Sequence, residues 1–275
     1  MLGHAVMRTL FDSNSKIKVY GTARSSYVRT VLTEIPADQF IIGFDAEKTD
    51  NLIDIFARIQ PDVVVNCIGV VKQLEVAKNP LTVLPLNTML PHRLERLCAN
   101  AGARLIHIST DCVFSGTRGR YLESDASDTT DLYGKSKYLG EVTGANSVTL
   151  RTSIIGHELN TSHSLIEWFL RQQGDISGYT KAIFSGLPTI ELARVIRDFV
   201  LPNPSLSGLY HVASAPISKY DLLNLVAQYY GKSIKITPDN SVVIDRSLDG
   251  QLFAQETGYH VPDWPQLIQI MCEKK

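Results

Sequence analysis

Apolar positions in the first half of the chain follow two different spacings. Leu52, Ile55, Phe56 and Ile59 recur at helical spacing within a helix predicted over Asn51–Gln60. The stretch Asp62–Ile68 has consecutive valines without polar alternation, which is typical of a parallel strand covered on both faces. The other predicted elements are helices over Gly3–Phe11 and Leu86–Ala101 and strands over Lys18–Thr22, Phe40–Phe44 and Arg104–Ser109. Pro91 is expected to kink the second of these helices or to lie near its first turn.

This alternation of helices and strands predicts an α/β fold, a Rossmann-like doubly wound parallel sheet with right-handed crossovers. Beyond Arg151 the alternation is less regular. Leu209–Val212 is predicted as a late strand, and Ser218 as the N-cap of a helix over Lys219–Tyr230. We therefore expect a core over residues 1–152. Residues 153–275 are expected to form mainly a small lobe, with some segments returning to the core.

Composition excludes several classes of protein. Hydrophobic residues make up 44% of the chain, charged residues 20%, and the formal net charge is −1, so nothing favours nucleic acid or a membrane surface as a partner. The apolar runs are too short to cross a bilayer, and no secretory segment is recognisable. The cysteines are scattered without metal-ligand spacing, at Cys67, Cys98, Cys112 and Cys272. We expect no metal site, and reduced thiols in a cytoplasmic protein.

The strongest chemical signal is a tyrosine and a lysine four residues apart. On a helix, this spacing places Tyr133 and Lys137 on one face. A nearby ammonium lowers the pKa of a phenol and can make it a usable acid at neutral pH. The spacing alone is weak evidence, because chance matches on solvated helix faces are common.

The residue at the end of the preceding strand strengthens this signal. Arg104–Ser109 leads into Thr110, and open α/β sheets bind ligands at the carboxyl ends of their strands. A hydroxyl there can share a substrate carbonyl oxygen with the tyrosine, stabilising negative charge as hydride arrives. The alternative is that Thr110 merely ends a strand.

An ordered set of segments resembles the extended short-chain dehydrogenase/reductase family and, within it, the dTDP-4-dehydrorhamnose reductases. These segments are Pro61–Asn66, Ile108–Phe114, Tyr133–Lys137, Leu150–Ser153 and Gly208–Ala213. The resemblance implies a catalytic triad of Thr110, Tyr133 and Lys137. It also implies that Asn87 is the helix asparagine that supports a proton relay. The alternative for Asn87 is a polar residue that stabilises the kink beside Pro91.

The resemblance further implies a dinucleotide-binding core. Met1, Leu2 and Gly3 are similar to the end of the family's glycine-rich phosphate-binding turn, Gly3 being the glycine of close helix packing. The first strand and the earlier glycines of that turn are absent from the sequence given, so we expect this chain to bind dinucleotide poorly. The other implied contacts are Asp45 and Ala46 with adenine, Cys67, Ile68 and Gly69 at a strand end beside the cofactor, and Lys137 with the nicotinamide ribose.

Arg24 bears on the choice of cofactor. It follows the predicted strand Lys18–Thr22, which corresponds to the second strand of the family's fold. A guanidinium at this position can neutralise a 2′-phosphate, and this favours NADPH, with NADH as the alternative. A solvent-facing arginine without such a role is the other interpretation.

The implied reaction is NADPH-dependent reduction of the 4-keto group of a deoxysugar carried on dTDP or UDP, for the synthesis of surface polysaccharide precursors. By the same resemblance, Val71, Lys72, Asp111 and Val113 lie near this nucleotide-sugar substrate in a lobe that binds it, and a homodimer is compatible with it. Two alternatives stay open. One is a nucleotide-sugar epimerase of the same superfamily, which retains its cofactor, and the other is a non-catalytic, reductase-like regulatory subunit.

Overall fold

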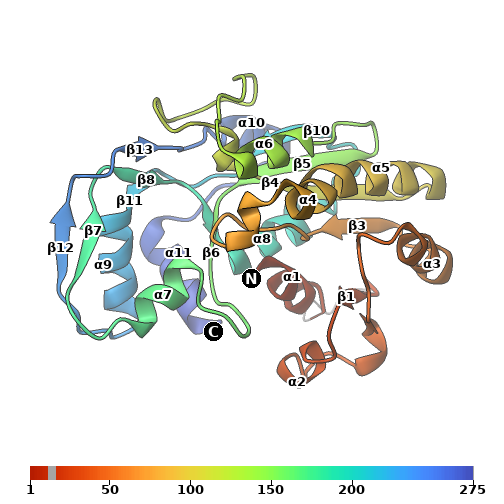
Figure 1. Ribbon diagram of the computed structural model, residues 1–275, viewed down its shortest axis with the longest axis horizontal. Helices are drawn as coiled ribbons and strands as arrows, with labels where there is room; N and C mark the ends of the chain where they lie inside the picture. Colours follow the sequence, from red (N-terminus) through yellow and green to blue (C-terminus); the bar gives the residue numbers. More distant parts are fainter. Residues whose placement is uncertain (12–16, 275) are drawn as a thin grey trace.

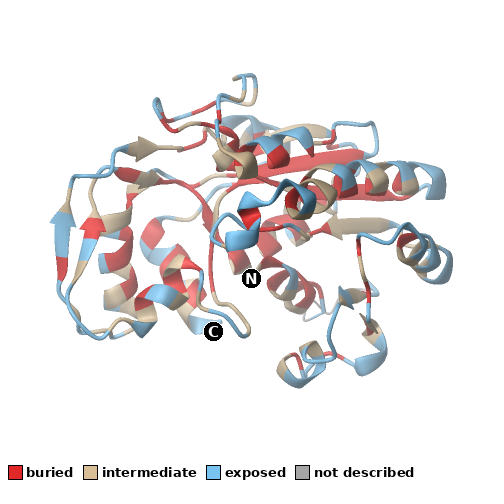
Figure 2. Ribbon diagram, viewed as in Figure 1, coloured by how far each residue is buried: buried red, intermediate tan, exposed pale blue. Residues whose placement is uncertain are grey.

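The centre of the protein is a four-stranded parallel sheet (Figure 1), seen in a computed structural model that describes residues 1–11 and 17–274. The strand order is β10–β5–β4–β3. The strands are β3 (Val63–Asn66), β4 (Arg104–Thr110), β5 (Ser147–Thr152) and β10 (Gly208–His211). Every residue of β5 is buried, and the strands at the middle of this sheet form the most deeply buried part of the molecule in Figure 2. Since Thr110 pairs with Thr152, β4 and β5 end at the same edge of the sheet.

Helices cover both faces of this sheet. On one face, Ile106 and Val148 belong to a core shared with α1 (Leu2–Phe11) and α8 (Thr189–Val195). On the other face, Leu105 packs in a cluster with residues of α3 (Thr49–Ile59) and α5 (Leu90–Ala101). This arrangement confirms the predicted doubly wound α/β fold, and the unbroken apolar strands reflect burial on two sides.

Two short strands form a separate parallel sheet. These are β1 (Gly21–Ala23) and β2 (Phe40–Ile42), and among the described residues neither pairs with β3. The predictions placed the first strand three residues too early and let the second run on to Phe44. The second ends at Ile42 because Gly43 adopts a φ of +78°, which a strand cannot continue. Between them lie α2 (Val28–Val31) and a 3₁₀ turn over Ala37–Gln39.

The helical segment before β4 is longer and less regular than predicted. It consists of α4 (Pro80–Val83), a π-helix over Leu84–Met89, and α5, whereas the prediction began at Leu86. Pro91 lies in the first turn of α5, as one of the two predicted placements required. A proline lacks the N–H for a backbone hydrogen bond, and a change from π-helical to α-helical geometry just before it lessens that loss.

Most of the remaining strands and helices form a lobe beside the sheet (Figure 1). Its strands are β7 (Ile176–Tyr179), β8 (Ala182–Phe184), β11 (Ile217–Ser218), β12 (Ile236–Asp239) and β13 (Ile244–Asp245), and the short strands β6 (Ile154–Ile155) and β9 (Leu187–Pro188) pair nearby. Its helices are α7 (Leu165–Arg171), α9 (Lys219–Tyr229) and α11 (Trp264–Glu273). Helix α10 (Gln251–Thr257) packs against β10 of the central sheet, and a π-helix over Ile196–Val200 follows α8.

Two predictions for this half are confirmed. The late strand is β10, which returns to the central sheet and pairs with β5. Ser218 caps α9, its hydroxyl oxygen accepting a hydrogen bond from the backbone N–H of Asp221 at 3.0 Å. Within the described part of the chain, no helix has the length and apolar character needed to cross a membrane.

Candidate active site

Thr110, Tyr133 and Lys137 come together at the carboxyl end of β4. Tyr133 and Lys137 lie on α6 (Leu132–Leu139), and both side chains face the strand. The Thr110 side chain lies near enough to act on the phenol of Tyr133, and the Lys137 ammonium donates to the carbonyl of Ile108 at 2.7 Å. The three side chains that the sequence singled out are therefore neighbours in the structure.

Helix α6 can approach the strand end this closely because its third residue is glycine. A Cβ atom at Gly134 would lie 2.3 Å from the Cys112 carbonyl oxygen and 2.4 Å from the Thr129 hydroxyl. Asp131 caps the helix, its carboxylate accepting from the backbone N–H of Gly134 at 2.8 Å. The first turn of α6 is thus fixed against the loop that follows β4, which sets the position of Tyr133.

Burial has the largest effect on the pKa values of Tyr133 and Lys137. It raises the pKa of the Tyr133 phenol, and it lowers the pKa of Lys137 to about 8. The sequence predicted that the ammonium lowers the pKa of the tyrosine, whereas the net effect of the surroundings is to raise it, chiefly through burial. A contribution of Lys137 stays a prediction. The groups that act on Tyr133 are Cys112, Thr110, Asp111 and Asp131, whereas the Lys137 ammonium is directed at the strand backbone.

Asn87 is fully buried in the π-helix and joins two segments. Its side-chain oxygen accepts from the N–H of Val70 at 2.8 Å. Its amide nitrogen donates to the Val70 carbonyl and to the Ser136 hydroxyl, at 3.1 and 3.2 Å. The side chain thus connects the loop after β3 with α6, one residue from Lys137. A role in proton relay stays a prediction.

The residues expected to meet the cofactor lie mostly at the carboxyl ends of β1, β2 and β3. Arg24 follows β1 and is exposed, without a hydrogen-bond partner among the described residues. After β2, the Asp45 carboxylate accepts from the N–H of Glu47 at 3.1 Å, and Ala46 is buried. After β3 come Cys67 and Ile68, both half-buried, and then the exposed Gly69.

The start of α1 faces the end of β3. A Cβ atom at Gly3 would lie 3.7 Å from that of Cys67, an ordinary contact. Met1 is half-buried, and the side chain of Leu2 is part of the hydrophobic core, so Leu2 offers only its backbone to a ligand.

This chemistry fits a phosphorylated dinucleotide in two respects. Among the described residues, Arg24 is a cation at a strand end without a partner, and two of the three ammonium protons of Lys137 also have none. A Cβ atom at Gly69 would lie 3.2 Å from the Asn87 oxygen, so a larger residue there would crowd Asn87.

The residues expected near the substrate differ in exposure. Val71 is 41% exposed, and Lys72 forms an ion pair with Asp131 at 2.7 Å. Asp111 is buried and accepts from the Thr110 hydroxyl at 3.1 Å, and burial raises its pKa. Val113 is fully buried in a cluster with Phe114, Tyr121 and Leu248. The side chain of Val113 is thus not exposed, and the expected place of this residue near the sugar stays a prediction.

Arg246 was missed by the sequence analysis. Its Nε donates to the Phe114 carbonyl at 2.7 Å, and its charge acts on Asp111, Cys112 and Asp131 beside Tyr133. It follows β13 of the lobe, far from this helix in sequence, and no local pattern marks it.

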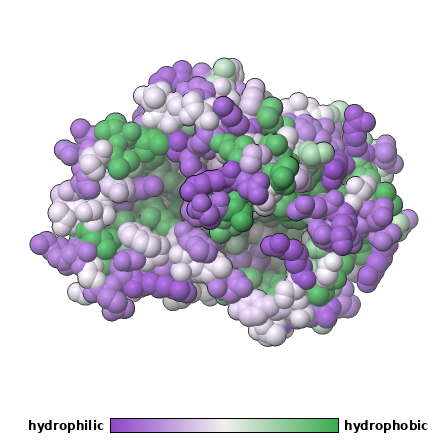
Figure 3. Space-filling view, in the orientation of Figure 1, coloured by the Kyte–Doolittle hydropathy of each residue, from purple (hydrophilic) through white to green (hydrophobic). Residues whose placement is uncertain are grey.

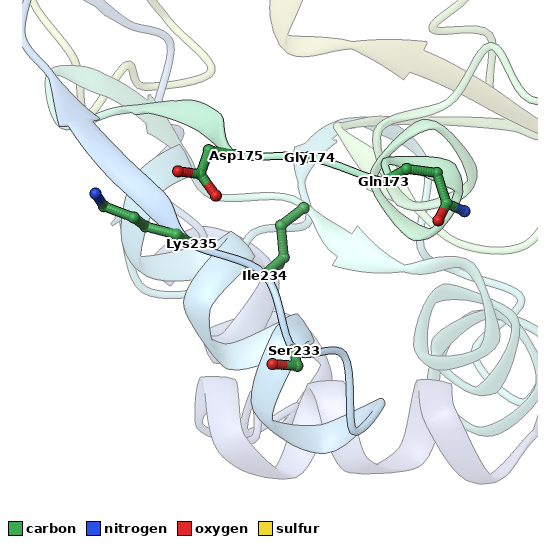
Figure 4. Close-up of a pocket in the computed structure, with 6 residues that line it drawn as sticks. All are labelled: Gln173, Gly174, Asp175, Ser233, Ile234 and Lys235. Atoms are coloured by element: carbon green, nitrogen blue, oxygen red, sulfur yellow. The ribbon is translucent and has the colours of Figure 1, made fainter.

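The pockets found on the surface lie away from this site. One, of about 430 Å³, is lined by residues of the segments 173–175 and 233–235 at the edge of the lobe (Figure 4). The side chains drawn in Figure 4, among them Gln173, Asp175 and Lys235, do not converge on one point. Apolar and polar side chains are mixed over the face shown in Figure 3. Among the described residues, no cluster of His, Cys, Asp and Glu could hold a metal ion.

A doubly wound sheet with a threonine at a strand end, beside a tyrosine and a lysine four residues apart on a helix, defines the short-chain dehydrogenase/reductase class. The model of one family within it, described as the RmlD substrate binding domain, matches residues 1–244. The chain belongs to this family, which confirms the resemblance found in the sequence.

Individual relatives carry several names. The chain is 26% identical to the dTDP-4-dehydrorhamnose reductase of Escherichia coli, covering 85% of this chain and 89% of that protein. It is 30% identical to the Bacillus subtilis spore coat polysaccharide biosynthesis protein SpsK, over 64% of each chain. It is 31% identical to methionine adenosyltransferase 2 subunit beta of Danio rerio, over 70% of this chain and 64% of that one. The chain thus spans about 64% of the length of the last two relatives.

Solved structures share the fold. A hypothetical dTDP-4-dehydrorhamnose reductase from Sulfolobus tokodaii superimposes with a TM-score of 0.76 at 22% identity, covering 96% of this chain and 94% of that one. The Bacillus anthracis dTDP-4-dehydrorhamnose reductase, solved in complex with NADP, gives a TM-score of 0.75 at 19% identity, covering 90% and 95%.

Proposed function

We propose that this chain is an NADPH-dependent reductase of the 4-keto group of a nucleotide-linked deoxysugar. The observation that carries the proposal is the meeting of Thr110, Tyr133 and Lys137 at the carboxyl end of β4. The similarity to proteins named dTDP-4-dehydrorhamnose reductase supports the substrate class. The similarity to SpsK supports a use of the product in polysaccharide synthesis.

The roles of the three side chains follow from their chemistry. A bound nicotinamide cofactor supplies the hydride for the keto carbon. Tyr133 donates a proton to the keto oxygen, and its raised pKa keeps the phenol protonated at neutral pH. The Thr110 hydroxyl hydrogen-bonds the same oxygen as negative charge develops there. Lys137 holds the ribose of the cofactor with the ammonium protons that Ile108 does not use.

Cations at the mouth of the site suit an anionic substrate. Among the described residues, Arg246 forms a hydrogen bond only through its Nε, so its terminal N–H groups can serve a diphosphate. Lys72 can join it once a ligand competes with Asp131 for the ammonium. For the cofactor, Arg24 supports NADPH over NADH. A cytoplasmic location and a homodimer stay predictions.

The test is to follow NADPH oxidation with a small panel of dTDP- and UDP-linked 4-keto sugars. Consumption of NADPH with the appearance of the 4-hydroxy sugar supports the proposal. Conversion of one sugar to its epimer without net NADPH consumption would identify an epimerase instead.

A second candidate is a non-catalytic regulatory subunit, favoured by the similarity to methionine adenosyltransferase 2 subunit beta. This candidate predicts no turnover of any sugar in the panel. It also predicts a change in the kinetics of a methionine adenosyltransferase catalytic subunit when this chain is added.

A further inference from the structure

Three consecutive residues of β4 each interact with the segment that carries Tyr133 and Lys137. The Ile108 carbonyl accepts from Lys137 at 2.7 Å, the Ser109 hydroxyl donates to Glu141 at 2.6 Å, and the Thr110 side chain acts on the Tyr133 phenol. Glu141 follows α6 immediately after its C-cap, one helical turn beyond Lys137. The strand end therefore holds a carboxylate as well as the two candidate catalytic groups.

The surroundings of Lys137 make its charge costly. The residue is 6% exposed, and its ammonium donates a hydrogen bond to a neutral carbonyl. The titratable groups that face it are the Cys67 thiol at the end of β3, His107 on β4, and Glu141. Glu141 is the only one of these three that is normally charged at neutral pH.

The Glu141 carboxylate is itself fixed on both oxygens. Arg151 on β5 donates to Oε1 through Nε and to Oε2 through its terminal nitrogen, each at 2.7 Å. The two side chains are 7% and 3% exposed. Behind them, His211 accepts from Arg151 at 3.3 Å through Nε2 and donates from Nδ1 to the Tyr121 carbonyl at 3.0 Å.

This histidine stays neutral. Burial and the neighbouring Arg151 charge lower the pKa of His211 to about 4, so it adds no second cation to the network at neutral pH. A buried ion pair of this kind adds little net stability compared with apolar side chains of similar volume. Its place beside Lys137 therefore indicates a role other than stability.

We propose that Glu141 is a positioning residue whose carboxylate, held by Ser109 and Arg151, keeps the buried Lys137 side chain charged. The effect of Glu141 on the pKa of Lys137 is upward, opposing that of burial. The consequence for catalysis rests on the proposed function, since it assumes that charged Lys137 is the active form. The protonation of Lys137 itself does not depend on that assumption.

The test is Glu141→Gln, which keeps the shape of the side chain and removes its charge. The Lys137 pKa is measured by side-chain NMR on protein with ¹⁵N-labelled lysine, without substrate, using Lys137→Arg to assign the signal. We expect this pKa to fall by about one unit or more, the usual effect of losing a close opposite charge. In an active enzyme, the alkaline limb of kcat/KM should move to lower pH by the same amount.

Two controls separate charge from structure. Ser109→Ala removes a hydrogen bond to Glu141 but leaves the carboxylate, so the Lys137 pKa should stay close to that of the wild type. If Glu141→Gln does not fold because Arg151 is left unpaired, the double variant Glu141→Gln/Arg151→Met is compared with Arg151→Met alone, and the Lys137 pKa should be lower in the double variant. An unchanged Lys137 pKa in a folded variant without Glu141 overturns the proposal. If Glu141→Gln lowers the Lys137 pKa but the wild-type protein turns over no keto sugar, the result counts against the proposed function alone.

Discussion

The hydroxyl of Tyr133 lies within reach of the Thr110 side chain and of the Asp111 carboxyl group. A phenol in this position stays protonated at neutral pH, because burial raises its pKa. It is therefore suited to donating a proton and not to storing a negative charge. This position of the hydroxyl predicts that removing its oxygen atom from Tyr133 lowers activity.

Replacing Tyr133 by Phe removes the proton donor and little else. We expect turnover to fall by at least about a hundredfold, since a general acid contributes about 10²–10⁴-fold. NADPH affinity should be nearly unchanged, as measured by fluorescence titration beside steady-state kinetics. Tyr138→Phe on the same helix is the matched control, because Tyr138 is 44% exposed and its loss should leave turnover unaltered. Turnover of the Tyr133 variant at the wild-type rate would remove this residue from the mechanism.

Arg24 permits a second test at the scale of one side chain. If its guanidinium binds the 2′-phosphate, Arg24→Ala should weaken NADPH binding by roughly 1.5–3 kcal/mol, the value of a charged hydrogen bond, and leave NADH binding nearly unchanged. Calorimetry with both cofactors measures the difference. Arg58→Ala serves as the control, because Arg58 is also exposed but lies elsewhere, on α3. Equal losses for the two cofactors would show that Arg24 acts only as a general positive charge.

At the scale of elements, the site depends on how closely α6 approaches the end of β4. Gly134→Ala would place a methyl group 2.3 Å from the Cys112 carbonyl, which is backbone and cannot turn aside. We expect a loss of about 1–3 kcal/mol in the free energy of unfolding, as for other overpacked sites, together with lower turnover because Tyr133 is displaced. Urea titration measures the first effect.

The matched control for this prediction is Gly174→Ala, because a Cβ atom there meets nothing within 4 Å. It should change neither stability nor turnover appreciably. If the Gly134 variant is as stable as the control, α6 has more freedom than the close contact indicates.

Elements with strong local patterns were predictable from the sequence, and contacts between distant segments were not. The strands around Val64 and Ile106 carry unbroken apolar runs, and the Ser218 cap precedes its helix directly. The short lobe strands such as β12 contain exposed residues and, at Pro238, a proline. No alternation of apolar and polar residues therefore marks them as strands. Arg246 reaches the site only through the packing of the lobe against the loop after β4. The π-helix around Asn87 also lacks a sequence signature of its own.

At the scale of the whole molecule, three histidines link stability to pH. Burial lowers the pKa values of His4 on α1 and His211 on β10 from 6.5 to about 4, and it lowers the pKa of His107 on β4 well below its ordinary value. Between these pH values the unfolded chain binds more protons than the folded one. The free energy of unfolding should therefore decrease as the pH falls from about 6.5 toward 4.

Urea unfolding at half-unit pH intervals over this window measures the effect. His211→Gln should reduce the slope of stability against pH even if it lowers stability overall. His260→Gln, at an exposed position, should leave the slope unchanged. A slope that both variants share with the wild type would show that His211 does not carry the effect.

Because of the π-helix over Leu84–Met89, the contacts of this segment depend on its exact number of residues. A π-helical turn holds more residues than an α-helical one, and each residue of an α-helix turns the chain by about 100°. Deleting one residue there would let the segment close as a regular α-helix, and the part before the deletion would rotate relative to α5. Asn87 would then point away from Val70 and Ser136, although its neighbours in sequence were the same. Substitutions in this segment can therefore be judged one by one, whereas a change of its length by a single residue shifts every contact that it makes.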